Sequence, residues 1–159
     1  MASKLARQNT GDREITISRV VIAPRELVWK AFTDPKHVSQ WWGPNGFTNT
    51  IHEMAVRPGG VWRFIMHGPD GTDYPNYIVF DEIVRPERLT YAHGIDANNP
   101  PEFHVTVTFE EESRGTRVTL RLVTETAEAC DKIKASGAVE GGKQTLNRLE
   151  VYLKTMASA

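Results

Sequence analysis

The sequence predicts an α+β fold in which a seven-stranded, curved antiparallel sheet wraps around a long C-terminal helix. Three observations lead to this prediction. Between residues 48 and 125, short β-branched and aromatic runs alternate with turns that contain Gly and Pro, as in antiparallel strands joined by hairpins. One strand and two short helices precede this region, and an apolar stripe at helical spacing follows it. Because the last helix is the only long one expected, it must cover the apolar face of the sheet.

The first strand and the two short helices are indicated by local residue preferences. "EITISRVVI" (14–22) is rich in β-branched residues, which favours a strand. Pro24 suits the first position of the helix that follows. Asp34 and Pro35 suit the N-cap and first residue of a second, shorter helix. Gly43 then suits a left-handed C-cap, so this helix ends beside the pair Trp-Trp.

The later strands show which side chains face inward. "FHVTVTF" (103–109) alternates cleanly, so we expect its apolar residues to face the helix and His104 to face solvent. Residues 126–134 are expected to form at least one helical turn. The final helix then carries an apolar stripe with spacings of three and four residues: Leu146, Leu149, Leu153 and Met156.

Two glycines near the start of the final helix go against helix preference. Gly141 and Gly142 each cost roughly 1 kcal/mol relative to Ala in a helix interior. We therefore expect this part of the helix to approach the sheet closely, or to leave room for a ligand.

Composition limits the organisation and the partners of the chain. Its 159 residues indicate one domain, which we place at 14–159 after a flexible N-terminal tail at 1–13. The net charge of −1 and the lack of a basic block argue against nucleic acid and anionic membranes as partners. No apolar run is long enough for a membrane span. The only cysteine, Cys130, excludes an intrachain disulfide and fits a cytoplasmic location.

Several longer strings carry a family resemblance. They are "APRELVWKAFTDP" (23–35), "WWGPNGF" (41–47), "VRPGGVWRF" (56–64), "GPDGTDYPN" (68–76), "EIVRPERLTY" (82–91), and "VTFEE" with "GTRVTL" between residues 107 and 120. Together they resemble the SRPBCC superfamily (START-like, helix-grip fold). Within it they are most similar to the group related to the C-terminal domain of the ATPase activator of the ninety-kilodalton heat-shock protein. The resemblance covers about residues 14–156. One departure is Ala55, where the group usually has an acidic residue.

The resemblance implies a hydrophobic cavity under the C-terminal helix, open near the second short helix. Either Trp41 or Trp42 is expected at its mouth beside Phe47, with the other tryptophan in the core; the sequence does not decide which. The alternative is that both rings simply cap the sheet. The residues predicted to bind a ligand there are Trp41, Trp42, Phe47, Trp62, Phe64, Met66, Tyr77, Tyr91 and His93. Ordinary core packing of the strand residues, and a surface position for Tyr77, are the competing interpretations.

Motifs for catalysis, metals and nucleotides are weak. The five histidines lack the spacing of a zinc site, so no metal is expected. "GAVEGGK" (137–143) resembles a phosphate-binding loop, but Gln144 replaces the required Ser or Thr, and we expect no cofactor. Glu82 is expected to pair with Arg85 or Arg88. No catalytic residue is predicted; His93, on the inward face of its strand, would be the candidate only if the chain were an enzyme.

The leading functional hypothesis is therefore a small-molecule binding protein whose cavity takes a hydrophobic, amphipathic or aromatic ligand. One alternative is a protein-interaction module like the stress-related co-chaperone relatives. Another is an enzyme of cyclase, dehydratase or hydrolase type that uses the same cavity. Monomer and homodimer both remain open, because the sequence indicates no interface.

Overall fold

The computed structural model describes residues 10–158. The elements in chain order are η1 (Gly11–Arg13), β1 (Glu14–Val21), α2 (Arg25–Thr33), α3 (Pro35–Val38), β2 (Thr48–Met54), β3 (Val61–His67), β4 (Asp73–Val84), β5 (Arg88–Gly94), β6 (Phe103–Glu112), β7 (Gly115–Thr124), α4 (Ala127–Ala135) and α5 (Ala138–Ser158). Of the predicted tail, residues 1–9 lie outside the described residues. Residues 10–13 pack on the sheet and α4, with Arg13 donating a hydrogen bond to the carbonyl oxygen of Thr124.

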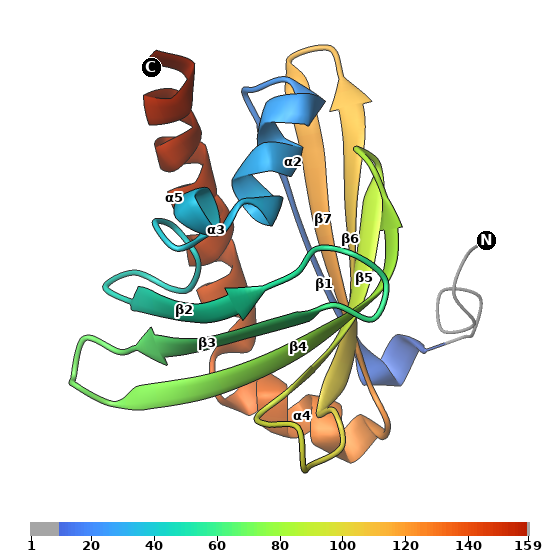
Figure 1. Ribbon diagram of the computed structural model, residues 1–159. Helices are drawn as coiled ribbons and strands as arrows, with labels where there is room; N and C mark the ends of the chain where they lie inside the picture. Colours follow the sequence, from blue (N-terminus) through green and yellow to red (C-terminus); the bar gives the residue numbers. More distant parts are fainter. Residues whose placement is uncertain (1–9, 159) are drawn as a thin grey trace.

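The seven strands form one antiparallel sheet in the order β1-β7-β6-β5-β4-β3-β2. Figure 1 shows β2, β3 and β4 sweeping across the view while β1, β7 and β6 stand upright, so that the sheet curls around α5. Register shifts between Ile51 and Glu53 and between Phe80 and Glu82 lie in the curved half. Such bulges bend a strand and increase its twist. The predicted helix-grip fold is confirmed.

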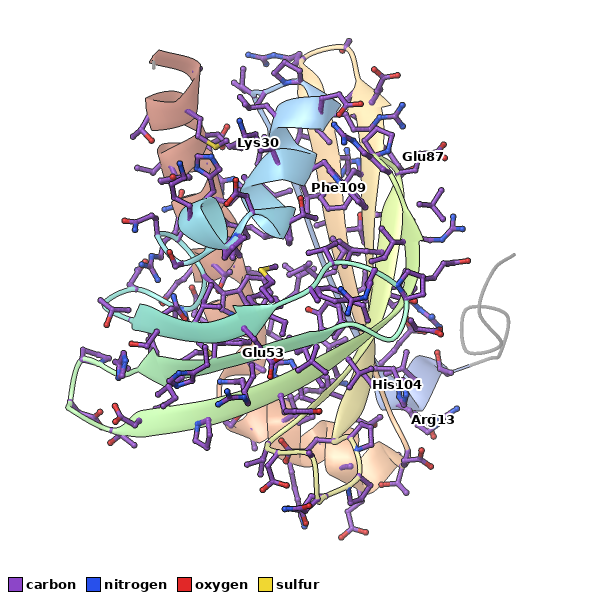
Figure 2. All side chains as sticks on the ribbon, viewed as in Figure 1. Arg13, Lys30, Glu53, Glu87, His104 and Phe109 are labelled. Atoms are coloured by element: carbon purple, nitrogen blue, oxygen red, sulfur yellow. The ribbon has the colours of Figure 1, made fainter. Side chains whose placement is uncertain are left out.

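The core fills the space between the inner face of the sheet and the helices. As predicted for residues 103–109, the apolar side chains face inward, and Val105, Val107 and Phe109 are buried. Phe109 lies between α2 and the sheet (Figure 2), where its ring makes edge contacts with Trp29 and Phe32 of α2. This packing fixes α2, and with it α3, over one end of the sheet.

Helix α3 begins as the local residues predict, whereas Pro24, which was expected at the first helical position, is the extended residue just before α2. The Asp34 side chain accepts a hydrogen bond from the Lys36 backbone N–H (2.9 Å), which caps α3. Backbone bonds from Trp41 and Trp42 to the carbonyl oxygen of Val38 continue the helical turn past the end of α3. Gly43 ends it with a φ of 98°, a left-handed conformation that favours glycine.

The two C-terminal helices meet at Gly137. The predicted helical stretch after β7 is the full helix α4, capped by Thr126, and Gly137 (φ 89°) separates it from α5. In α5, the predicted stripe is buried at Leu146, Leu149 and Leu153. An inward-facing arginine on β1, Arg19, bonds Glu150 of α5 at 2.8 Å and ties the helix to the edge strand. None of the helices formed by residues 10–158 is long and apolar enough to cross a membrane.

Candidate functional site

A cavity of about 340 Å³ lies between the inner face of the sheet and the first turns of α5. Its floor comes from five strands: Ile15 and Ile17 of β1, Met66 of β3, Tyr91 and His93 of β5, Phe103 and Val105 of β6, and Leu120 and Leu122 of β7. Its walls and roof come from Trp42, Gly43 and Pro44, and from Ser136, Gly137, Ala138, Gly141, Gly142 and Thr145 around the start of α5. The volume is at the small end of the range of about 300–1,000 Å³ for ligand pockets.

One side of the cavity is formed by the loop that follows α3, and Arg148 of α5 holds this loop. The Arg148 guanidinium donates to the backbone carbonyl oxygens of Gly43 and Pro44 at 2.8 Å each and of Phe47 at 3.0 Å. A longer bond of 3.3 Å reaches the carbonyl oxygen of Trp42. Partial burial lowers the pKa of Arg148, but a guanidinium stays protonated in proteins. The charged guanidinium of Arg148 therefore holds the loop by its backbone carbonyl oxygens.

Two polar side chains add to this attachment. The Asn45 backbone N–H donates to Oε1 of Gln144 on α5 at 3.0 Å. From the sheet side, Nδ2 of Asn49 on β2 donates to the carbonyl oxygens of Trp42 (2.9 Å) and Ser39 (3.2 Å). The loop is therefore held from both the helix and the sheet, and Trp42 is held with it.

The two glycines of α5 allow the close approach that the sequence suggested. A Cβ at Gly142 would collide with Cδ1 of Ile17 on β1, and a Cβ at Gly141 would lie 3.3 Å from Cγ of Pro44. Larger side chains at these two positions would occupy the space where the helix, the loop and the edge strand meet. Both glycines also line the cavity, so the space they leave belongs to it.

The polar groups on the cavity floor come from β5. Nε2 of His93 lies 2.7 Å from Oδ1 of Asn76 on the neighbouring strand β4. Burial lowers the pKa of His93 to about 4, so the imidazole is neutral at neutral pH. Burial also raises the pKa of the Tyr91 hydroxyl, which therefore stays protonated and remains a hydrogen-bond donor.

The structure brings four of the nine predicted residues to the cavity: Trp42, Met66, Tyr91 and His93. Trp42, not Trp41, is the tryptophan that faces it. Trp41 is only 1% exposed, and its indole Nε1 donates to the carbonyl oxygen of Ala31 in α2 at 3.1 Å. Because two adjacent residues of a helical turn point in different directions, one ring enters the core and the other reaches the cavity.

The other four predicted residues lie elsewhere. Trp62 and Phe64 share the inward face with Met66, as predicted, but they are buried in the core, where their rings stack at 4.4 Å. Phe47 contributes its backbone carbonyl to the Arg148 attachment, while its ring lies 5.9 Å from that of Tyr74. Tyr77 pairs with Arg63 and Gly94 on the outer face of the sheet, because strand alternation places its neighbours Asn76 and Ile78 inward.

Sequence reasoning missed Arg148, Asn76 and the segment 136–138 as parts of the site. Arg148 donates to backbone carbonyl oxygens, and because every residue has one, the residue types do not indicate which carbonyls are its acceptors. Asn76 lies near the β3–β4 hairpin, and only the register across β4 and β5 brings it to His93. The one usable signal was the glycine pair in α5, which indicated unusual space at this point of the helix.

The remaining polar clusters lie outside the cavity. Within residues 10–158, no group of three or more His, Cys, Asp and Glu side chains is placed to hold a metal ion. The predicted ion pair of Glu82 forms with Arg88 at 2.8 Å, whereas Arg85 pairs with Glu26. On the outer face, His67 bonds both Thr50 and Asp73 at 2.7 Å, but none of these three residues lines the cavity.

Comparison with known proteins places this geometry in a family context. Residues 22–154 match the family model described as Activator of Hsp90 ATPase homolog 1-like protein. No curated protein matches the chain.

Solved structures share the whole fold. A protein from Mycobacterium smegmatis is 27% identical with a TM-score of 0.84, and the match covers 94% of this chain and 96% of that one. A protein from Arthrobacter aurescens is 26% identical with a TM-score of 0.83, covering 93% and 90%. A protein from Nitrosomonas europaea, at 24% identity, has a TM-score of 0.83 and covers 94% and 99%, a likeness of fold alone.

Proposed function

Since the chain belongs to the family of Activator of Hsp90 ATPase homolog 1-like proteins, whose fold commonly binds ligands or proteins, we propose that it binds a small hydrophobic or amphipathic molecule between the sheet and α5. The observation that carries this proposal is the cavity of about 340 Å³ beneath the first turns of the helix. Side chains from five strands form its floor, and those from β1, β3, β6 and β7 are apolar. Burial of an apolar ligand there would contribute about 25 cal/mol per Å² of apolar surface removed from water.

The distribution of polar groups fits an amphipathic occupant. Tyr91 and His93 lie on the floor, and Ser136 and Thr145 lie near the start of α5. The rest of the lining is almost entirely apolar. A few polar groups in an apolar pocket typically fix the orientation of a ligand while apolar contact supplies its affinity.

The alternatives receive less support from the same residues. A protein-interaction site at "WWGPNGF" calls for exposed apolar rings, but Trp41 is 1% and Trp42 9% exposed. An enzyme calls for a titratable group matched to the working pH. With a pKa of about 4, His93 is a weak general base at neutral pH, although it remains a good hydrogen-bonding group.

Native mass spectrometry of the freshly purified protein, compared with the denatured mass, tests the proposal. Two matched variants place the ligand. Leu122→Phe adds volume on the cavity floor, and Ile65→Phe adds similar volume on the outer face of β3. We expect a small-molecule adduct on the wild type and on Ile65→Phe that is weakened or lost on Leu122→Phe. Circular dichroism and melting temperature check that both variants fold.

Two results would count against binding in the cavity. One is an adduct that persists equally in Leu122→Phe, which would place the ligand elsewhere. The other is a clean apo mass together with no rise in melting temperature across a panel of hydrophobic metabolites. That second result would favour a protein partner over a small-molecule ligand.

We also propose a cytoplasmic location for the protein. Its single cysteine, Cys130, is a buried free thiol, which fits that location.

A further inference from the structure

His93 is the most polar side chain on the cavity floor, and its surroundings restrict what it can bind. It projects from β5 next to Tyr91, and its ring lies 4.7 Å from the ring of Phe103. None of the described residues that line the cavity is Asp, Glu, Lys or Arg. A charged ligand group would therefore be buried here without a countercharge, which is costly.

The hydrogen bonds of Asn76 determine which nitrogen of His93 carries the proton. Nδ2 of Asn76 donates to the backbone carbonyl oxygen of Tyr74 at 2.8 Å. Its Oδ1 must then be the atom that faces His93, and an amide oxygen only accepts. Nε2 of His93, at 2.7 Å from that oxygen, is consequently the protonated nitrogen. In a neutral imidazole the other nitrogen, Nδ1, is left as an acceptor.

Two polar atoms on the floor are then available to an occupant. Within residues 10–158, Nδ1 of His93 and the Tyr91 hydroxyl form no hydrogen bond. Nδ1 requires a donor, and the hydroxyl both donates and accepts. The ring centroids of Tyr91 and His93 are 6.2 Å apart, so the two side chains occupy the same part of the floor.

We propose that the occupant is an uncharged molecule whose hydroxyl or N–H group donates a hydrogen bond to Nδ1 of His93. This inference rests on the proposed binding function and deepens it by naming the recognised group. A phenol, alcohol or ring N–H compound satisfies the site. An ether or hydrocarbon with the same ring system would cover Nδ1 without giving it a hydrogen-bond donor. The cost of that unpaired nitrogen is what would make the site prefer a donor ligand over such an analogue.

The test uses three probes that share the naphthalene ring system: 2-naphthol, 2-methoxynaphthalene and naphthalene. Each is titrated into ¹⁵N-labelled protein, and backbone and indole chemical shifts give the Kd. The wild type is expected to bind 2-naphthol at least about tenfold more tightly than the methyl ether, which corresponds to one net hydrogen bond. His93→Phe is expected to bring the two affinities within about twofold. The matched control, His104→Phe on the outer face, should keep the wild-type ratio (Figure 2).

Side-chain ¹⁵N spectra of the histidines give a readout that needs no variant. We expect the free protein to carry the His93 proton on Nε2, and the Nδ1 resonance to shift with 2-naphthol but not with 2-methoxynaphthalene. A proton on Nδ1, or equal wild-type affinities for the hydroxyl and ether probes, would overturn the inference and leave the binding function standing. Failure of all three probes to bind would overturn both.

Discussion

Nη1 of Arg148 lies 2.8 Å from the carbonyl oxygen of Gly43, although the two residues are 105 positions apart in the sequence. This bond and its neighbours join the C-terminal helix to the loop that carries Trp42. The loop contributes Trp42, Gly43 and Pro44 to the cavity wall, and the start of α5 contributes the part of the lining that adjoins them. Arg148 therefore controls the shape of the cavity without lining it.

Arg148→Met should loosen this loop. The substitution keeps an apolar stem but removes the charged donor, and it leaves several carbonyl oxygens without their partner. We expect the free energy of unfolding to fall by about 1.5–3 kcal/mol. Hydrogen exchange should quicken at Phe47, whose N–H bonds the Pro44 carbonyl. Lys143→Met, at an exposed position of the same helix, is the control and should change neither quantity. Equal urea midpoints for the two variants would show that the loop is held by other contacts.

The two adjacent tryptophans should differ in what they contribute. Trp41→Phe removes the indole donor and leaves the Ala31 carbonyl oxygen unpaired in the core, so we expect a loss of about 2–4 kcal/mol of stability. Trp42→Phe enlarges a cavity that already exists, and its cost should be about 1–2 kcal/mol. Urea unfolding of both variants measures the difference. A larger loss for Trp42→Phe would contradict the division between core and cavity.

The neutral state of His93 predicts a pH dependence of stability. Its pKa is about 4 in the folded protein and 6.5 as the reference value, so the unfolded chain binds more protons between these values. The contribution of the neutral His93 to the free energy of unfolding is fully present above pH 6.5 and is lost as the pH falls toward 4. His93 should contribute a loss of between about 1 and 3 kcal/mol over this window.

Comparison with His93→Phe isolates this contribution, since the carboxylates titrate alike in both proteins. The stability difference between wild type and variant, from urea unfolding at several pH values, should therefore change between pH 6.5 and 4. A difference that stays constant across that range would show that His93 does not titrate abnormally in the fold.

Gly142 and Gly141 form a matched pair in α5. Alanine at 142 would press on Cδ1 of Ile17 and displace that side chain on the cavity floor, whereas alanine at 141 meets only a tight contact with Pro44. Both changes gain helix preference of up to about 1 kcal/mol. We expect Gly142→Ala to weaken 2-naphthol binding at least about threefold relative to Gly141→Ala. Calorimetric titration of each variant with 2-naphthol measures this difference. A larger loss of affinity for Gly141→Ala would show that the ligand does not lie against Ile17 of β1.

The sequence was sufficient for the fold and for the direction of many side chains. Alternation in residues 103–109 placed Phe109 and its neighbours inward, and the same parity placed His93 inward on β5. These predictions depend only on the two-residue period of a strand. The same period put Trp62 and Phe64 on the correct face, but it does not indicate where along the strand the core ends and the cavity begins.

The parts of the site that could not be predicted from the sequence depend on contacts between residues that are far apart along the chain. The choice between Trp41 and Trp42 is made by the turn between α3 and Gly43. The role of Asn76 follows from its register with β5, and that of Arg148 from a loop that folds over α5. Backbone carbonyls are present at every residue, so no residue pattern marks the ones that Arg148 uses.

The most direct test of ligand binding in the cavity is a measurement of nuclear Overhauser contacts between bound 2-naphthol and ¹³C-labelled methyl groups. The methyl groups of Met66 and Leu122 line the cavity, and that of Ile65 lies on the outer face of the sheet. We predict cross-peaks from the ligand to Met66 and Leu122 and none to Ile65. Cross-peaks to outer-face methyl groups alone, or none to any methyl group at saturating 2-naphthol, would contradict the account.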